Sequence, residues 1–296
     1  MAGNLRSFIL FAAIASCAGV HDGSPASDLG VPAKISLTPG QIAVIRHKLP
    51  ADADPIALSC NGKRVAFYVA PDGDLNAYIS EPYFSKLVPY TCKLRTSKGE
   101  AVVARITPKK KTFPRENLNV DPDKVVLSKK DALRAAEERK IIAAVYKEGS
   151  ADIPYFEAPF GRPVPENVTS VYGIRRIFNK QQKGQHLGVD FAAREGTPVK
   201  SSNRGRVVFT GDLFYAGNIV IIDHGLGIYT IYAHLSKIDV AKSDIVEKGE
   251  GIGLSGRTGR VTGPHVHWGV RVMGELSDGQ SILEASTGFP DFNTPQ

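Results

Sequence analysis

The chain has 296 residues, 42% of them hydrophobic and 23% charged, a composition typical of soluble globular proteins, and its length predicts two domains. The formal net charge is +7, and the excess lies in residues 1–150, which hold 22 basic and 15 acidic side chains, whereas residues 151–296 hold 15 of each. Since the basic residues form no nucleic-acid-binding motif, we expect no nucleic-acid partner. The run 109–111 is typical of a solvated linker, and attraction to an anionic cell envelope is the alternative.

Residues 1–19 are typical of an export signal. Arg6 precedes an apolar stretch over 8–15, and small residues follow it. The stretch is shorter than the ~20 apolar residues that a transmembrane helix needs. We therefore expect an exported protein of the periplasm or cell envelope, with the small, polar residues 20–32 as a tether.

Cys17 ends the run Ile14-Ala15-Ser16-Cys17, which resembles the lipobox of bacterial lipoproteins. The resemblance implies that Cys17 carries lipid, becomes the N-terminus and attaches the protein to a membrane. The alternative is an ordinary signal peptide cut nearby. Cysteine parity favours the lipobox, because Cys60 and Cys92 then form a natural disulfide pair in an oxidising compartment.

Residues 33–107 predict an immunoglobulin-like β-sandwich, in which seven short β-rich runs alternate with turn signals. Side chains alternate along a strand, so Cys60 and Cys92 each lie on a face that we expect to be buried. Tyr90, two residues before Cys92, resembles the tyrosine corner of immunoglobulin-like folds. No chemistry follows from this pattern, and we expect a spacer or binding module.

Residues 108–150 predict a basic linker followed by a helix. Ser128 opens the helical pattern with Asp131 three residues on, as in a capping box, and Gly149 ends it. We expect the helix to pack between the two domains.

Residues 151–296 predict a compact antiparallel sheet from Phe156 onward, because glycines punctuate almost every connection between short β-rich runs. We interpret residues 274–296 as a tail. The fold class is therefore mainly β, with a sandwich, a linking helix and a second sheet domain.

Four of the seven histidines lie in patterns that suit a metal site: His186-x-x-x-Asp190, His234 at a strand end, and His265-x-His267. Residues two apart on a strand project from the same face, which brings two imidazoles together. With a carboxylate they form a ligand set suited to zinc. A catalytic zinc takes three protein ligands, so the surplus histidines favour an enzyme over a structural or storage site.

Residues 159–272 resemble the lysostaphin-type zinc endopeptidases, the LytM-domain family, in three segments that occur in the right order: 186–211, 217–236 and 253–270. The resemblance implies an antiparallel sheet with a groove for the wall peptide. It implies one zinc ion held by His186, Asp190 and His267. His265 and His234 would act on the water and the tetrahedral intermediate, and either could be the general base. Two further residues match positions that line the family's cleft, Asn218 and Tyr232.

The resemblance further implies a zinc metallo-endopeptidase that hydrolyses peptide cross-links of bacterial peptidoglycan. We expect the protein to work as a monomer. All five site positions are intact, which argues against the alternative, a non-enzymatic peptidoglycan-binding regulator of another hydrolase. The chain departs from the family after the last strand, where GELSDGQSILEAS replaces a common Asp-Pro. The bond cleaved stays open between D-alanine to meso-diaminopimelate cross-links and glycine bridges, as does whether the wall is the cell's own.

Overall fold

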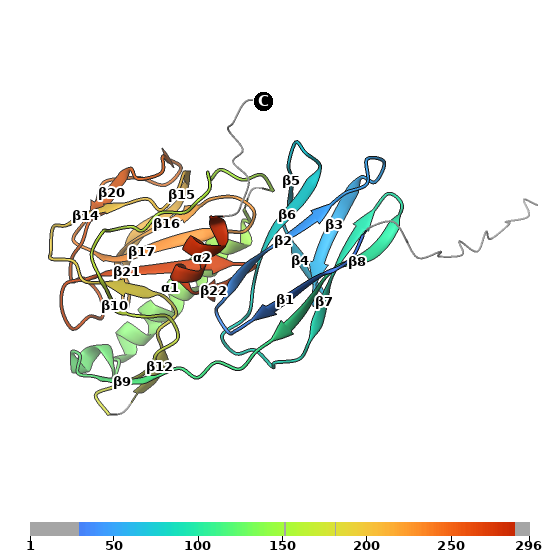
Figure 1. Cartoon of the computed structure of the whole chain (residues 1–296). Helices are drawn as coiled ribbons and strands as arrows, with labels where there is room; N and C mark the ends of the chain where they lie inside the picture. The colour runs from blue at the N-terminus through green and yellow to red at the C-terminus, as the bar shows by residue number, and fades with distance from the viewer. Residues whose placement is uncertain (1–29, 151, 181, 288–296) are drawn as a thin grey trace, which may run out of the picture.

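The computed structural model describes residues 30–150, 152–180 and 182–287, and two groups of β-sheets lie side by side in it (Figure 1). The predicted export signal, the lipobox at Cys17 and the first part of the tether lie outside the described residues. Within the described ranges no helix is long and apolar enough to cross a membrane.

Residues 33–108 form two sheets. One has the order β1 (Ala33–Leu37), β8 (Gly99–Pro108), β7 (Tyr90–Thr96), β3 (Pro55–Cys60), β4 (Lys63–Val65); the other has the order β2 (Ile42–Lys48), β6 (Asp74–Ser80), β5 (Tyr68–Val69). Buried side chains of both sheets form one hydrophobic cluster that includes Ile45, Leu58 and Leu94. The predicted strands are present, and residues 64–69, one of the seven predicted β-rich runs, divide between β4 and β5, which belong to different sheets. The immunoglobulin-like assignment stays a prediction.

Cys60 and Cys92 form the expected disulfide. They are paired residues of the neighbouring strands β3 and β7 in one sheet, whereas the disulfide of antibody domains joins two sheets. The Tyr90 hydroxyl donates a hydrogen bond to the side-chain carboxylate of Glu81 at 3.1 Å, while a tyrosine corner bonds to the backbone.

The larger sheet of the second half has the order β10 (Val168–Ser170), β13 (Val189–Phe191), β21 (Val266–Val272), β17 (Tyr229–Leu235), β16 (Gly217–Asp223), β15 (Gly205–Leu213), β19 (Ile245–Val246), and β22 (Glu275–Ser277) pairs with β21. These strands pair antiparallel, as predicted. One face covers a core that includes Val220, Tyr232 and Trp268. A small sheet of β14 (Pro198–Lys200), β20 (Gly251–Leu254) and β18 (Lys237–Ile238) completes this half.

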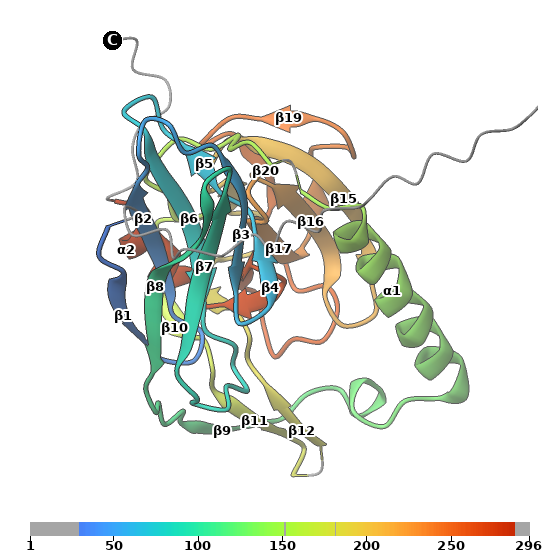
Figure 2. The same ribbon diagram turned by 90° about the vertical axis from the view of Figure 1, so that its right-hand side faces the viewer.

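Helix α1 (Lys129–Lys147) begins where the sequence predicts, with Ser128 Oγ accepting a hydrogen bond from the Asp131 backbone N–H at 3.1 Å. The helix does not lie between the two halves. It lies along the outer face of the large sheet, where Ile142 and Tyr146 pack against residues of β16 and β17 (Figure 2). The expected position was wrong: the helix fully buries only Ala135 and Val145, and Leu133 of the predicted apolar stripe stays exposed.

The connector before α1 is more ordered than a solvated linker. Its lysines 109–111 are exposed, but β9 (Arg115–Leu118) and a short 3-10 helix, η1 (Pro122–Lys124), follow them. Strand β9 pairs in parallel with β11 (Arg175–Phe178), which also pairs with β12 (Gln182–Gln185). A segment predicted to be a linker therefore extends a hairpin of the second half.

The interpretation of residues 274–287 as a tail is wrong, because β22 and helix α2 (Gly279–Ser286) occupy this stretch. The backbone N–H of Ile42 donates to Ser281 Oγ at 2.8 Å, and that of Asp278 donates to the Gly40 carbonyl at 2.8 Å. The segment thus joins the two halves. Three of its four buried helical residues are glycine or serine, and such side chains give a sequence pattern little sign of burial.

Candidate metal centre

Strands β13 and β21 place the predicted ligands. They pair antiparallel with Asp190 directly opposite His267, and His186 lies just before β13. His265 precedes His267 by two residues and lies at the start of β21, next to the loop 256–264. Two chain segments far apart in the sequence therefore meet at one end of the large sheet.

The side chains of His186, Asp190 and His267 converge on one point. Asp190 Oδ1 lies 2.9 Å from His186 Nε2 and 2.8 Å from His267 Nδ1, and these two nitrogens are 3.1 Å apart. One ligand atom from each residue lies within 4.8 Å of the others. Two imidazole nitrogens and a carboxylate oxygen are a donor set that fits a zinc ion, and this is the set that the sequence predicts.

The protonation states of these groups suit a cation. Burial disfavours the charged form of Asp190, but its contacts with the His186 and His267 rings outweigh burial and hold the carboxyl pKa well below its usual range. Burial lowers the pKa of His267. His186 Nδ1 lies 3.0 Å from the Val171 carbonyl, and a carbonyl only accepts, so the proton sits on Nδ1 and the Nε2 lone pair points to the site.

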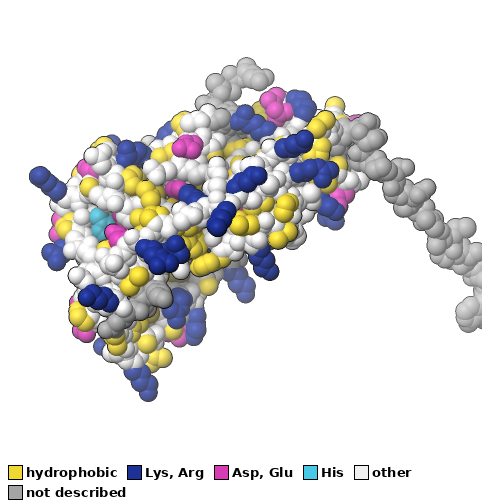
Figure 3. Space-filling view, turned by 60° about the horizontal axis from the view of Figure 1, so that its bottom comes forward, with side chains coloured by type: hydrophobic (Ala, Val, Ile, Leu, Met, Phe, Trp, Pro, Cys, Tyr) yellow, Lys and Arg dark blue, Asp and Glu magenta, His cyan; other side chains and the backbone are white. Residues whose placement is uncertain are grey.

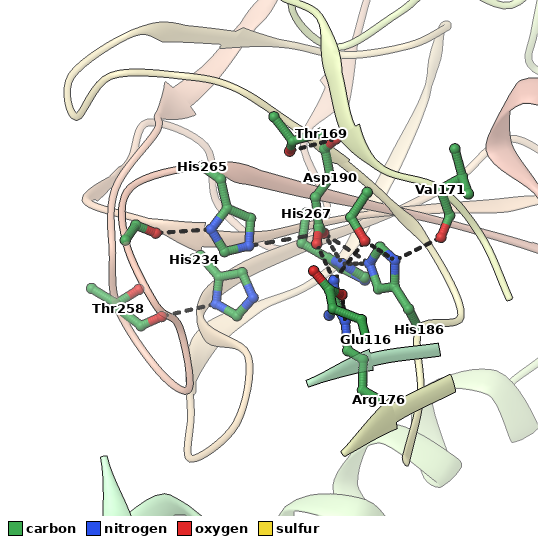
Figure 4. Close-up of polar contacts among 12 residues, drawn as sticks. Glu116, Thr169, Val171, Arg176, His186, Asp190, His234, Thr258, His265 and His267 are labelled. Carbon is green, nitrogen blue, oxygen red and sulfur yellow. Dashed lines mark hydrogen bonds and ion pairs between the residues drawn. The ribbon is translucent and has the colours of Figure 1, made fainter. Parts of the chain in front are cut away.

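His234 and His265 lie side by side next to these ligands, with ring centroids 4.8 Å apart (Figure 4). Their Nδ1 atoms donate to the carbonyls of Thr258 at 2.8 Å and Gly263 at 2.9 Å, so each neutral ring keeps its lone pair on Nε2. His265 Nε2 is 3.8 Å from Asp190 Oδ1.

Both of these rings are neutral near pH 7. Burial and the neighbouring histidines lower the pKa of His234 to about 3, and burial lowers the pKa of His265. His234 also has φ +63, a left-handed backbone conformation that costs a non-glycine residue energy and recurs at functional sites. Two neutral imidazoles beside a metal site can each accept a proton from water.

The structure does not bring Tyr232 to the site. Its side chain is fully buried beneath the sheet, and its hydroxyl accepts from the Ser202 backbone N–H at 2.7 Å. Side chains alternate along β17, so Ile231 and Ala233 face the cleft and Tyr232 faces the core. Asn218 is not among the described residues that line the cleft; its amide donates to the Leu235 carbonyl at 3.1 Å, which supports the strand end that carries His234.

The metal centre lies in a cleft of about 550 Å³, and histidine side chains reach the surface there (Figure 3). Sequence reasoning missed three charged residues that line it, Glu116, Arg176 and Arg260. The Arg260 guanidinium lies over the rings of Phe178 and Tyr215, 4.2 and 4.5 Å from their centroids. Arg260 lies in the segment 253–270, which matches the family and so carries a sequence signal, whereas no sequence signal links Glu116 to a site about seventy residues away.

Residues 184–279 match the model of peptidase family M23. These residues form a peptidase family M23 domain. The chain is 55% identical over 108 residues to the peptidoglycan DD-endopeptidase ShyA of Vibrio cholerae, and 47% identical over 123 residues to the DD-carboxypeptidase/endopeptidase Mpg of Neisseria meningitidis. These matches cover 36% and 42% of this chain but 25% and 27% of the relatives, so the chain spans only about a quarter of the curated relatives' length.

A solved structure from Pseudomonas aeruginosa, assigned to peptidase M23, is similar over both halves of the molecule. It is 28% identical, with a TM-score of 0.65, and the match covers 87% of this chain and 97% of that one. The M23 domain contains all five predicted metal and catalytic residues. Four of them lie within β13, β17 and β21 or at the ends of these strands, and the fifth, His186, lies two residues after the start of the domain.

Proposed function

We propose that this chain is a zinc-dependent endopeptidase that hydrolyses peptide cross-links of bacterial peptidoglycan. The observation that carries the proposal is the convergence of His186, Asp190 and His267 on one point, with two further neutral histidines beside it in an open cleft. The names of the relatives ShyA and Mpg, an endopeptidase and a carboxypeptidase/endopeptidase, support the reaction class.

In this proposal His186, Asp190 and His267 hold one zinc ion. When bound, zinc supplies the Lewis acidity that lowers the pKa of water and polarises a carbonyl group. The fit rests on two imidazole nitrogens and one carboxylate oxygen that lie within hydrogen-bonding distance of one another.

His265 and His234 supply proton transfer. His265 removes a proton from the attacking water, and the leaving amine receives that same proton after it passes to His234, which in its protonated form also donates a hydrogen bond to the oxyanion. Since both neutral rings carry a lone pair on Nε2, a donor role requires that the ring first gains a proton. The two roles are therefore exchangeable on present geometry.

The proposed bond joins D-alanine to meso-diaminopimelate. The designation DD in the names of the relatives ShyA and Mpg refers to a bond between two D-configured centres, which this cross-link contains and glycine bridges do not. The substrate is a wall peptide, and we propose that the protein acts on it as a monomer, with residues 33–107 as an immunoglobulin-like spacer or binding module.

Purified protein distinguishes the proposed enzyme from its rivals. An enzyme binds one zinc ion and clears a suspension of cell walls without another protein. A regulator clears the wall only when a second hydrolase is added, and a zinc-storage protein binds metal without any lytic effect. The intact set of five site residues favours the enzyme.

We also propose that the protein is exported and that a lipid on Cys17 holds it at a membrane. A diacyl anchor gives lasting attachment where one chain does not, and residues 18–32 would give a reach of about 20 Å as a flexible coil. Cys17→Ser should move the protein from the membrane fraction to the soluble fraction. Wild-type protein that is soluble, with a mature N-terminus after Cys17, would show that the anchor is absent.

A further inference from the structure

We propose that Glu116 and Arg176 are positioning residues for Asp190, so that strand β9 completes the metal centre from outside the M23 domain. The inference rests on the proposed function, because it concerns the same metal site. Glu116 and Arg176 both precede residue 184, where the family match begins. Glu116 extends the site into residues 108–150, the segment that the sequence presents as a linker and helix.

Strand β9 is fixed at both ends, which gives Glu116 a defined place. At one end the backbone N–H of Arg175 donates to the Pro114 carbonyl at 2.9 Å. At the other end the Asn179 side chain bonds both the N–H and the carbonyl of Val120, each at 2.9 Å. Between them the parallel register pairs Glu116 with Arg176.

Phe113 anchors the approach to the strand. Its ring is almost fully buried and stacks on Tyr83 at 4.8 Å between centroids. It lies so close to Gly173 that a Cβ at this glycine would be 2.1 Å from the ring. The strand is therefore held against the hairpin by packing as well as by backbone pairing.

Arg176 connects this strand to the metal centre (Figure 4). Its Nε donates to Glu116 Oε2 at 3.3 Å, and its Nη2 donates to Asp190 Oδ2 at 2.6 Å. Nη2 also lies 2.9 Å from Ser170 Oγ, which lies 3.2 Å from His186 Nδ1. The guanidinium thus reaches one proposed ligand directly and approaches a second through a hydroxyl.

The two oxygens of Asp190 have separate partners. Oδ1 faces the nitrogens of His186 and His267, and Oδ2 faces Arg176. With Oδ2 held, rotation of the carboxylate is blocked and Oδ1 stays directed at the metal position. Such outer partners orient ligands, and their loss typically weakens metal binding by about 10- to 100-fold.

Glu116 is needed because an arginine is a flexible cation. Its carboxylate holds Nε while Nη2 binds Asp190, and it also offsets a positive charge that would otherwise repel a metal ion close by. Arg176 and Asp190 are largely buried, with side chains 17% and 7% exposed, so solvent screens these charges weakly. Removal of the Glu116 charge should therefore both loosen Arg176 and make the site more positive.

The experiment measures the zinc dissociation constant of the full chain by competition with a chromogenic chelator. Glu116→Gln keeps the shape of the side chain and removes its charge. We expect zinc to bind about 10-fold more weakly, the lower end of the range for outer partners, with an unchanged thermal midpoint. Glu247→Gln is the matched control, because Glu247 also accepts from an arginine Nε, that of Arg204 at 3.1 Å, just beyond β19 at the far edge of the sheet.

A double-mutant cycle tests whether Glu116 acts through Arg176. In the Arg176→Gln background, Glu116→Gln should change the zinc dissociation constant less than two-fold, since the connection is already broken. The inference is overturned if Glu116→Gln alone equals its control, or if it weakens zinc binding equally in both backgrounds. Wild-type protein that binds zinc but cleaves no cross-link would contradict only the peptidase proposal. The positioning role would stand, because it is judged by the ratio of zinc dissociation constants between variants and not by cleavage. Wild-type protein that binds no zinc would contradict both.

Discussion

At the scale of single residues, hydrogen-bond partners separate the proposed metal ligands from the proposed catalytic histidines. His186 and His267 each direct a ring nitrogen at Asp190 Oδ1 at less than 3 Å, whereas His265 lies 3.8 Å away. His234 is oriented by the Thr258 carbonyl. An imidazole whose Nδ1–H is bound to a carbonyl presents one lone pair, which suits proton transfer as well as coordination.

Two histidine variants should therefore behave differently. We expect His267→Ala to abolish both zinc retention and wall hydrolysis, because it removes a ligand and with it the Lewis acid. His234→Ala should keep most of the zinc and lose hydrolysis by about 100-fold or more, the cost of losing a group that stabilises the transition state. Elemental analysis of the two purified variants is the measurement. Full zinc occupancy in the His267 variant would remove this residue from the ligand set.

The histidine site could be predicted from the sequence because strand periodicity places residues two apart on one face, and the family segments supply the rest. The position of Tyr232 could not. It precedes His234 by two residues, so simple alternation puts both on one face, but the left-handed backbone at His234 breaks that alternation and leaves Tyr232 in the core. A sequence pattern predicts that side chains alternate along a strand, but it does not show at which residue the alternation is interrupted.

At the scale of elements, the sequence predicts those strands and helices that have their own local signals. Turn dipeptides bound the N-terminal strands, and the cap at Ser128 marks the start of α1. Strand β9 and helix α2 lack such signals, because β9 is a short polar run held by its partner β11, and α2 buries mainly glycine and serine. Tertiary contacts, which a linear pattern does not contain, define both.

The disulfide between β3 and β7 should stabilise the N-terminal sheets and leave the chemistry alone. Cys60 and Cys92 are 32 residues apart, and the entropy of closing such a loop in the unfolded chain corresponds to ~3–4 kcal/mol. We expect denaturant titration of the Cys60→Ala/Cys92→Ala variant to give a free energy of unfolding that is lower by this amount. The variant should still hydrolyse wall peptides at 25 °C. Free thiols at both positions in oxidised wild-type protein would exclude the disulfide, and loss of hydrolysis would show that the two halves are coupled through it.

At the scale of the whole molecule, the two halves are packed against each other. Ile42 and Tyr78 of the first half belong to the same buried cluster as Phe156 and Trp268 of the second. The Tyr78 ring meets the Phe156 ring edge to face at 5.8 Å between centroids. A contact of this kind fixes the orientation of the N-terminal sheets relative to the cleft.

A pair of glycine variants tests the packing of the two halves at a second contact, between Gly40 and Tyr172. A Cβ at Gly40 would lie 2.1 Å from the Tyr172 ring, whereas a Cβ at Gly62 meets nothing within 4 Å, and both glycines have positive φ, +85 and +75. Each alanine variant loses about 1 kcal/mol of stability to backbone strain. Gly40→Ala should lose about 1–3 kcal/mol more, because it forces apart the packed halves. Equal thermal midpoints for the two variants would show that Tyr172 does not pack there in solution.

The direct test of zinc-dependent cross-link hydrolysis is mass spectrometry of a purified, cross-linked muropeptide dimer incubated with the metal-free chain and with the same chain after addition of one equivalent of zinc. We predict that only the zinc-loaded chain converts the dimer into two monomers whose summed mass equals that of the dimer plus one water, with the break between D-alanine and meso-diaminopimelate. A dimer that stays intact with zinc-loaded chain, or is cleaved equally well by metal-free chain, would contradict the proposed function.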